Sequence, residues 1–211
     1  MRHLLIIGAR GFGREVYNLY TACKNAGTDI DCKGFLDDKM TALDGYEKYP
    51  PIISSVEDYQ ICDDDVFVCA LGDVHYKKKY VELIKSKGGT FISLIHPSVE
   101  IGSNTKIGDG CIIRYQSSIS CDITIGDFVT IMGFCVIGHD AKVGNYSHLG
   151  AHCFMGGFSR IEESVVMHPG SRLLPHKIIR NNSIIGAGSV VVTNVKENTT
   201  MLGVPAKRLI F

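Results

Sequence analysis

Histidines gather in the second half of the chain, where they could act as general bases or bind a metal ion. Five of the eight histidines follow residue 130. His139 stands directly before Asp140, and an imidazole can take up a proton near neutral pH. His148 and His152 are close in the sequence, so a three-histidine zinc site is a second possibility. The elements that carry these histidines decide between the two.

A glycine-rich loop near the start of the chain is a second candidate for chemistry. It reads Gly8-Ala9-Arg10-Gly11-Phe12-Gly13. Residues 2–7 predict a buried strand before it, and residues 14–25 predict a helix after it, an arrangement that opens many nucleotide-binding domains. The spacing is G-x-x-G-x-G, so the dinucleotide fingerprint is not met, and no lysine follows as in an ATPase P-loop. A nucleotide site and a simple tight turn both remain open.

Two carboxylates follow the next predicted strand. Asp37 and Asp38 stand roughly 25 residues after the glycines, where an acidic residue commonly meets a ribose hydroxyl. A third strand over residues 66–72 ends at Gly72, a helix over residues 74–86 follows, and a fourth strand covers residues 91–95. Strands that alternate with helices predict a parallel sheet with ligands at the carboxyl ends of its strands. Asp37 and Asp38 could equally begin a solvated loop.

A six-residue period governs the second half of the chain. Apolar residues occupy every sixth position from Ile95 to Val191, which makes 17 positions without a miss. Glycine follows eight of them, where a permissive backbone can serve a tight corner, and small or β-branched residues usually stand four positions on. A helix repeats its apolar face every 3.6 residues and a strand every two, so the period predicts a coil of short strands and corners.

The repeat places His139 at an outward corner of the predicted coil. Ile137 and Ala141 fill the apolar and small positions of its hexapeptide. With about 18 residues per coil, the position one coil further is Gly157, which has no side chain to block a ligand beside the imidazole. A ligand site at this corner is one interpretation, and a merely exposed corner histidine is the other.

Composition excludes several classes of protein. The 211 residues include 22 Lys and Arg and 22 Asp and Glu, so the chain has no net positive charge to attract nucleic acid. Apolar runs are far shorter than the roughly 18 residues of a membrane span, and the N-terminal residues lack a signal-peptide pattern. The eight cysteines form no C-x-x-C pair and show no metal-ligand spacing, which favours free buried thiols. We therefore predict a cytoplasmic protein without nucleic-acid or membrane partners.

Both halves together resemble the bacterial sugar O- and N-acetyltransferases that include the sialic acid O-acetyltransferases and the UDP-4-amino-sugar N-acetyltransferases. The hexapeptides resemble the left-handed β-helix of acyltransferases, and Gly203-Val204-Pro205-Ala206-Lys207 is similar to an ending found widely among them. The resemblance implies a small Rossmann-like parallel-sheet domain over residues 1–94, which binds a sugar nucleotide. It also implies a left-handed parallel β-helix over residues 95–211. Such coils are commonly homotrimers with acetyl-CoA between neighbouring subunits.

The resemblance also implies roles for individual residues. His139 becomes the general base, and Asp140 orients or charges its imidazole. Acetyl-CoA is expected beside His148, Gly157, Ala187 and Lys207, with no metal required. The residues expected to bind the sugar nucleotide are Gly8, Arg10, Gly11, Phe12, Gly13, Asp37, Asp38 and Gly72.

The glycine loop departs from the pattern of that family. Arg10 and Phe12 stand where the family often has serine and histidine. Phe12 could stack on a ring and Arg10 could pair with phosphate, but the nucleotide base stays open.

The expected function is acetyl-CoA-dependent acetylation of a nucleotide-linked amino sugar in surface-glycan biosynthesis. Two alternatives remain: O-acetylation of a free, sialic-acid-like sugar or small metabolite, and a non-catalytic trimeric binding module. The sequence leaves open which sugar and nucleotide are used, and whether nitrogen or oxygen is acetylated.

Overall fold

The computed structural model describes residues 2–210, which divide into two compact units between Pro97 and Ser98. The predicted boundary lay three residues earlier, at 94/95. Strand β6 (Leu94–Ile95), which carries the first apolar residue of the six-residue period, therefore falls within the first unit. Neither helix in the described part of the chain is long and apolar enough to cross a membrane.

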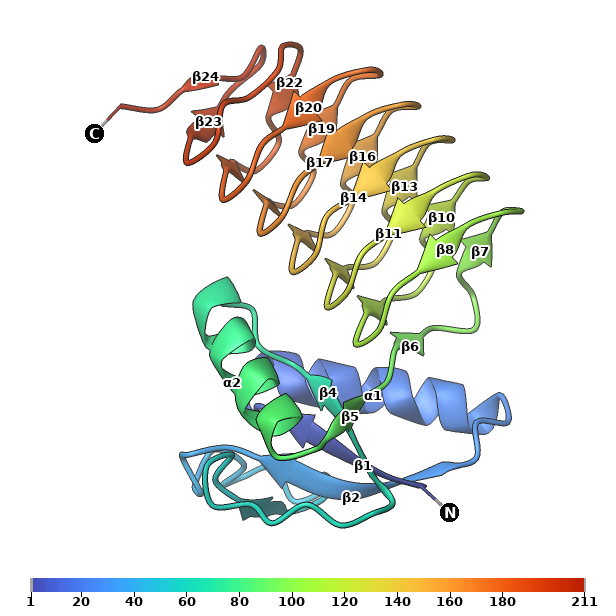
Figure 1. The fold of residues 1–211 in the computed structure, drawn as a ribbon, viewed down its shortest axis with the longest axis vertical. Coiled ribbons are helices and arrows are strands. Elements are labelled where there is room, and N and C mark those ends of the chain that lie inside the picture. The colour runs from blue at the N-terminus through green and yellow to red at the C-terminus, as the bar shows by residue number, and fades with distance from the viewer. Residues whose placement is uncertain (1, 211) are drawn as a thin grey trace. The chain divides into compact units, whose positions relative to one another are not determined.

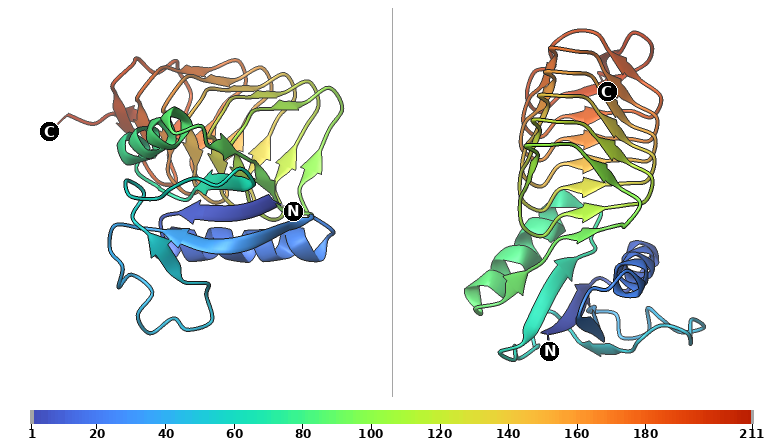
Figure 2. Two further views of the ribbon diagram at one scale, coloured as in Figure 1. Left: turned by 60° about the horizontal axis from the view of Figure 1, so that its bottom comes forward. Right: turned by 90° about the vertical axis from the view of Figure 1, so that its right-hand side faces the viewer.

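The first unit is built on a parallel sheet with the strand order β3-β2-β1-β4-β5. Its strands are β1 (Arg2–Ile7), β2 (Ile30–Leu36), β3 (Ile52–Ser54), β4 (Asp65–Cys69) and β5 (Thr90–Phe91). From β1 the chain first adds strands on one side and then returns to add β4 and β5 on the other. Helices α1 (Gly11–Asn25) and α2 (Val74–Ser86) consequently cover opposite faces of the sheet (Figure 2). The carboxyl ends of β1 and β4 form the switch point at which such sheets bind ligands.

The local sequence explains most of these elements, and three features depart from expectation. Helix α1 begins at Gly11, three residues before its predicted start, and α2 has the predicted bounds. Asp73 caps α2, because its side chain accepts a hydrogen bond from the Tyr76 N–H at 3.0 Å. Strand β3 was not predicted, because it has only three residues and none of them is buried. The predicted strand over residues 91–95 is divided between β5 and β6.

The second unit is a β-helix whose coils stack in parallel, visible in Figure 1 as the yellow-green to red part of the ribbon. Each coil supplies one two-residue strand to each of three faces. The first face contains β7 (Glu100–Ile101), β10 (Ser118–Ile119), β13 (Val136–Ile137), β16 (Phe154–Met155), β19 (Arg172–Leu173) and β22 (Val190–Val191). The second contains β8 (Lys106–Ile107), β11 (Thr124–Ile125), β14 (Lys142–Val143), β17 (Arg160–Ile161) and β20 (Ile178–Ile179).

The third face continues into the C-terminal segment. It contains β9 (Ile112–Ile113), β12 (Thr130–Ile131), β15 (His148–Leu149), β18 (Val166–Met167), β21 (Ile184–Ile185), β23 (Thr200–Leu202) and β24 (Lys207–Arg208). Each strand of the coil pairs with the strand three hexapeptides further along, as in Val136 with Phe154 and Ile137 with Met155. The prediction that three hexapeptides make one coil is therefore confirmed.

The repeating residues form the core of the coil. From Ile113 to Val191 every sixth residue is at most 3% exposed, whereas Ile101 on the first coil is 44% exposed. Most of the small positions are buried as well, and their polar atoms bond to the next coil: the Ser117 hydroxyl donates to the Met132 carbonyl at 3.1 Å. Cys135 donates in the same way to the Gly150 carbonyl, so this thiol packs inside the coil. The expectation of buried thiols was wrong for Cys62, which is exposed on the first unit.

The glycines of the repeat serve a purpose other than the predicted one. The left-handed backbone of each corner falls three positions after the apolar residue, as at Asp140 with φ 59°. Gly138, one position after Ile137, does not adopt it. A Cβ on Gly138 would lie 2.7 Å from the backbone nitrogen of Gly157. Glycine is needed there because two coils approach closely, and not because the corner bends.

Candidate functional site

A cavity of about 450 Å³ opens at the switch point of the first unit. Its lining consists of Ile7, Gly8, Arg10, Phe12, Gly13, Leu36, Asp37, Asp38, Val56, Ala70, Leu71, Gly72, Asp73, Tyr76 and Tyr80. Seven of the eight residues that were expected to bind a sugar nucleotide belong to this lining. Gly11 does not. The loops that follow β1, β2 and β4 therefore meet at one hollow, as the parallel sheet requires.

The glycines of the loop bring backbone to the edge of this cavity. Gly8 has φ +93°, and a Cβ there would lie 3.0 Å from the Ala70 carbonyl oxygen. A Cβ on Gly13 would lie 1.9 Å from the Gly8 carbonyl oxygen, so only glycine allows α1 to start this close to β1. The first N–H groups of α1 have no partner within the helix, and such groups favour an anionic ligand.

The two carboxylates of the cavity have different surroundings. Asp37 accepts hydrogen bonds from the Ala9 N–H at 2.8 Å and the Lys39 N–H at 2.9 Å, so it shapes the glycine loop. Asp38 accepts a 2.5 Å hydrogen bond from the Tyr80 hydroxyl. Burial, together with this carboxylate, raises the pKa of Tyr80.

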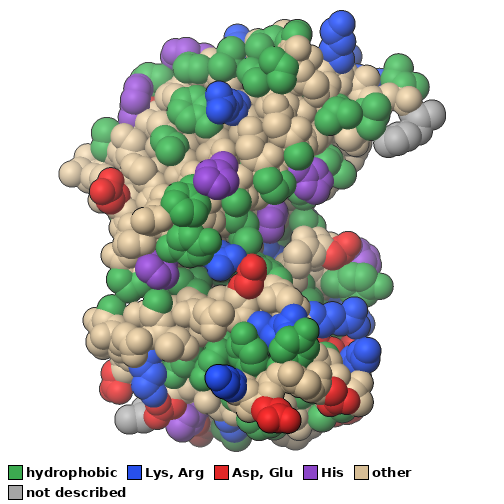
Figure 3. Space-filling view, turned by 180° about the vertical axis from the view of Figure 1, so that it is seen from behind, with side chains coloured by type: hydrophobic (Ala, Val, Ile, Leu, Met, Phe, Trp, Pro, Cys, Tyr) green, Lys and Arg blue, Asp and Glu red, His purple; other side chains and the backbone are tan. Residues whose placement is uncertain are grey.

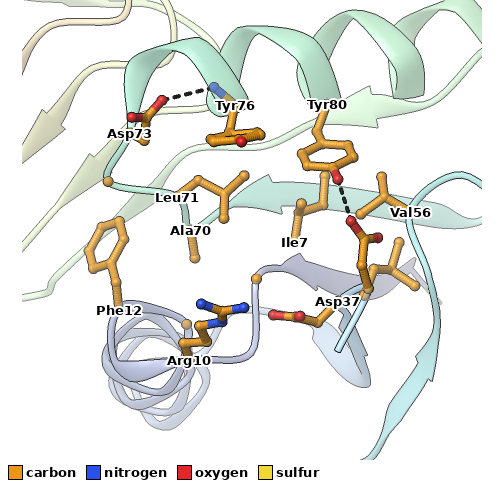
Figure 4. A pocket seen from close by; sticks show the side chains of 15 residues that line it. Ile7, Arg10, Phe12, Asp37, Val56, Ala70, Leu71, Asp73, Tyr76 and Tyr80 are labelled. Carbon is orange, nitrogen blue, oxygen red and sulfur yellow. Dashed lines mark hydrogen bonds between the residues drawn. The ribbon is translucent and has the colours of Figure 1, made fainter. Parts of the chain in front are cut away.

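Helix α2 supplies cavity residues that the sequence reasoning missed. Arg10 and Phe12 lie on one side of the cavity, and Tyr76 and Tyr80 of α2 lie on the opposite side (Figure 4). Asp73, which caps α2, also faces the cavity. The sequence held a signal for these residues, because a helix was predicted directly after Gly72. In a doubly wound sheet, the turn that follows the strand beside the switch point lines the ligand site.

On the coil, the side chains of His139 and Asp140 are hydrogen-bonded at a corner between the first and second faces. The Nδ1 of His139 lies 2.8 Å from Oδ2 of Asp140, and the two side chains are 55% and 41% exposed. With Nδ1 donating to the carboxylate, Nε2 carries the lone pair of the neutral ring. An imidazole held in this state can take up a proton from a ligand.

The imidazole itself occupies the space above Gly157. A Cβ on Gly157 would lie 2.8 Å from both Cε1 and Nε2 of His139. Gly157 was expected to leave room for a ligand, and in the structure it leaves room for the His139 ring. Phe158 stands edge-on to His139 with ring centroids 5.2 Å apart, and it fixes the other side of the ring.

The remaining residues expected to bind acetyl-CoA do not join this corner within one chain. His148 lies on β15, on the third face of the coil, and His139 follows β13 at the corner between the other two faces. Ala187 lies at a corner after β21, and Lys207 lies on β24 beside Leu202. Gly157 alone of this group contacts His139.

Comparisons with known proteins agree across both units. The sequence profile of the PglD N-terminal domain matches residues 3–84, and that of the GMPPB C-terminal domain matches residues 91–185. The GDP-perosamine N-acetyltransferase of Escherichia coli O157:H7 is 26% identical over 202 residues, 94% of this chain and 81% of that protein. The UDP-N-acetylbacillosamine N-acetyltransferase of Bacillus subtilis is 29% identical over 115 residues, 54% of this chain and 51% of that protein.

A solved structure extends the fold comparison to the whole chain. The perosamine N-acetyltransferase of Caulobacter crescentus, in complex with CoA and GDP-perosamine, superposes with a TM-score of 0.90 at 24% identity, over 100% of this chain and 98% of that one. This likeness shows the fold, a Rossmann-like domain followed by a left-handed β-helix. Across both units the chain is similar to the hexapeptide sugar acetyltransferases.

Two other histidines of the acetyltransferase take part in ring stacks. His152 stacks on Phe134 with centroids 4.9 Å apart, and His176 stacks on Phe158 at 5.0 Å. Among residues 2–210, no group of three or more His, Cys, Asp or Glu side chains is arranged to hold a metal ion. His148 and His152, which suggested a zinc site, belong to no such group.

Proposed function

We propose that this acetyltransferase transfers the acetyl group of acetyl-CoA to the amine of a nucleotide-linked sugar in surface-glycan biosynthesis. The observation that carries the proposal is the His139–Asp140 pair, whose Nε2 is available on an exposed corner of the coil. The relative that matches 94% of this chain is named a GDP-perosamine N-acetyltransferase, and one that matches 54% of it is named a UDP-N-acetylbacillosamine N-acetyltransferase. The reaction also needs a place for the nucleotide, and the cavity of the first unit supplies one.

His139 acts as the general base in this proposal. Acetyl-CoA supplies an activated acyl group. As the substrate amine forms its bond to the acyl carbon, Nε2 of His139 removes a proton from the nitrogen, and the bond from carbon to sulfur breaks. Asp140 stabilises the imidazolium that results, and Gly157 and Phe158 hold the ring in place.

The first unit holds the nucleotide. Phe12, Tyr76 and Tyr80 offer ring surfaces for a base, and Arg10 together with the N-terminus of α1 offers positive potential to phosphate. Asp38 retains an oxygen beyond the one that accepts from Tyr80, so it can accept from a ribose hydroxyl or a base. The same geometry accommodates more than one base.

A homotrimer completes the acetyl-CoA site in this proposal. His139 and His148 lie on opposite sides of the same coil, so a single chain cannot bring both to one acetyl group. A cyclic assembly brings a corner of one chain to a face of the next. The coil has apolar surface for such a contact: Phe134, Val136 and Ile184 are 38–44% exposed. Figure 3 shows one side of the coil on which hydrophobic and histidine side chains are common and charged ones are sparse.

The cytoplasm is the compartment in which we place this reaction. The eight cysteines are free. Burial raises the pKa of the Cys69 thiol to about 11, so this side chain stays protonated and unreactive at neutral pH. Free thiols persist where glutathione keeps proteins reduced.

The deciding experiment supplies acetyl-CoA with a panel of UDP-, dTDP- and GDP-linked amino sugars and detects products by mass spectrometry. The unmutated protein should acetylate at least one of them, and His139→Ala should lower turnover by at least about a hundredfold, the typical contribution of general-base catalysis. Product from free sialic acid but from no amino-sugar nucleotide would favour the O-acetyltransferase. No acetyl-CoA binding at all would favour a binding module.

A further inference from the structure

A hollow of about 290 Å³ lies on the second face of the coil, directly beside the His139 corner. Its lining consists of Asp140, Lys142, Phe158, Ser159, Arg160, His176 and Ile178. It begins at the corner that carries Asp140 and extends over β14, β17 and β20. The roles proposed above leave its two cations, Lys142 and Arg160, unused.

Lys142 and Arg160 project side by side from this face. They are register partners on the neighbouring strands β14 and β17, and both residues are exposed. Like charges directly opposite on paired strands destabilise a sheet. Within residues 2–210 neither cation forms an ion pair. The acids nearby are engaged, because Glu162 pairs with Arg180 at 3.2 Å and Asp140 pairs with His139. An anion bound between the two cations would remove their repulsion.

Phe158 adds an apolar surface between the base and the cations. Its ring is stacked on His176 and stands edge-on to His139, yet the residue is 51% exposed. It also adopts φ 58°, a conformation that a bulky residue takes at a cost. The hollow therefore offers an aromatic surface that contacts the His139 ring, with two cations beyond it.

We propose that this hollow binds the acceptor sugar through an anionic oxygen group, held by Lys142 and Arg160, with the sugar ring against Phe158. The inference rests on the proposed function of the same corner. Lys142 is three residues from His139, so the two backbones are at most about 10 Å apart. The phosphates of acetyl-CoA are separated from its thioester by the long pantetheine arm. A diphosphate or a ring carboxylate of the acceptor is bonded directly to the sugar, and it fits this short reach.

The test compares Lys142→Gln/Arg160→Gln with a matched control, Lys106→Gln/Arg172→Gln, which removes the same charge from outward positions of the coil that do not line the hollow. Each protein is assayed with acetyl-CoA and two kinds of acceptor: a nucleotide-linked neutral 6-deoxy amino sugar, and a nucleotide-linked amino sugar with a C6 carboxylate. The first variant should raise the acceptor KM by at least about tenfold, the effect of losing one charge-assisted hydrogen bond. The KM for acetyl-CoA should stay unchanged, and the control should behave as the unmutated protein.

The acceptors distinguish the two sources of the anion. A raised KM for both acceptors identifies the diphosphate, and a raised KM for the acidic sugar alone identifies the ring carboxylate. An unchanged acceptor KM, or a raised KM for acetyl-CoA alone, would overturn the proposal.

A binding measurement separates this proposal from the proposed function. Inorganic pyrophosphate is titrated calorimetrically into proteins that also carry Arg10→Ala, which removes the cation of the first unit. Binding should be weakened at least about tenfold by Lys142→Gln/Arg160→Gln and not by the control pair. If no acceptor is acetylated but this difference is found, the anion site stands and the proposed function fails. Equal binding by both variants would refute the anion site even in an active enzyme.

Discussion

At the scale of single residues, the proposed base depends on a contact between two neighbours in sequence. Adjacent side chains on a strand point to opposite faces, so they rarely bond to one another. His139 and Asp140 do so because Asp140 takes the left-handed corner conformation, which turns its carboxylate back to Nδ1. The ring is then confined by Gly157 below its edge and Phe158 beside it.

Asp140→Asn tests the role of the carboxylate. The amide keeps the size of the side chain but removes the charge that stabilises an imidazolium. We expect kcat to fall by at least about tenfold, less than for His139→Ala, with little change in the substrate KM values. Steady-state kinetics measure this, and circular dichroism checks the fold. A kcat equal to that of the unmutated protein would show that Asp140 does not assist His139.

Gly157→Ala tests the position of the ring. The added methyl group would lie 2.8 Å from two ring atoms of His139, so the imidazole must turn away. Because an exposed side chain can move at little energetic cost, the midpoint of thermal unfolding should change by only a few degrees, about 1 kcal/mol or less. Turnover should fall at least about tenfold, since misplacing a catalytic group is costly. Full activity would mean that the ring need not lie over Gly157.

At the scale of elements, the first unit depends on close packing at both ends of its sheet. At the carboxyl ends, Gly13 brings α1 against the backbone of Gly8. At the opposite end of β4, the Asp65 side chain is fully buried and contacts Lys33 at 3.1 Å and the Tyr59 hydroxyl at 2.7 Å. One end forms the cavity, and the other ties β2 and β4 together.

Gly13→Ala tests the close packing at the carboxyl ends of the sheet. The new methyl group would meet the Gly8 carbonyl oxygen at 1.9 Å, and backbone cannot move aside cheaply. We expect a loss of about 2–4 kcal/mol in the free energy of unfolding of the first unit, as for other overpacked sites, together with loss of nucleotide binding. Gly11→Ala is the matched control, because a Cβ there meets nothing within 4 Å. Urea titrations that rank the two variants equally would contradict the packing argument.

Asp65 makes the free energy of unfolding depend on pH in the acid range. Burial by itself raises the pKa of this carboxyl, but hydrogen bonds from the Cys62 N–H, Tyr59 and Lys33 outweigh it, and the pKa is lowered. The resulting stability is complete above the ordinary carboxyl pKa of about 3.9 and is lost as the pH falls through the lower folded-state value. Asp65→Asn should therefore be less stable at pH 7 and lose less stability than the unmutated protein below about pH 4. Identical acid dependence of the two unfolding free energies would exclude this role.

At the scale of the whole molecule, the coil determines what one chain can do alone. Its three faces keep His139 and His148 apart. If both residues serve one acetyl group, they come from different subunits, and activity requires assembly. Light scattering should therefore report a trimer of the 23.1 kDa chain.

Mixed assemblies test the shared site directly. His139→Ala and His148→Ala chains should each be inactive alone. When they are refolded together in equal amounts, about a quarter of the sites in a cyclic trimer receive both histidines, and about that share of the activity should return. No recovery, with mixed trimers verified by mass spectrometry, would mean that each chain uses only its own residues.

The sequence predicted what depends on period and on strand ends. The unbroken six-residue repeat required the coil and placed Gly157 next to His139, because a fixed register converts spacing in sequence into distance. Likewise, parallel strands bring their carboxyl ends together, so seven expected residues reached one cavity. Tyr80 and Phe158 were missed because their contacts come from packing between elements. The role predicted for the repeat glycines, a tight corner, was wrong because the close approach of two coils leaves no separate mark in the sequence.

The pairing of each strand with its counterpart on the next coil limits how the length of this chain can change during evolution. Deletion of a single hexapeptide between Phe158 and His176 would turn every later corner onto the next face and separate the two stacked rings. Insertion of three hexapeptides together would preserve the three faces, and beyond Val191 it would lengthen the coil without touching the His139 corner. Homologues of different length are therefore expected to differ by whole coils, added or lost away from the His139 corner.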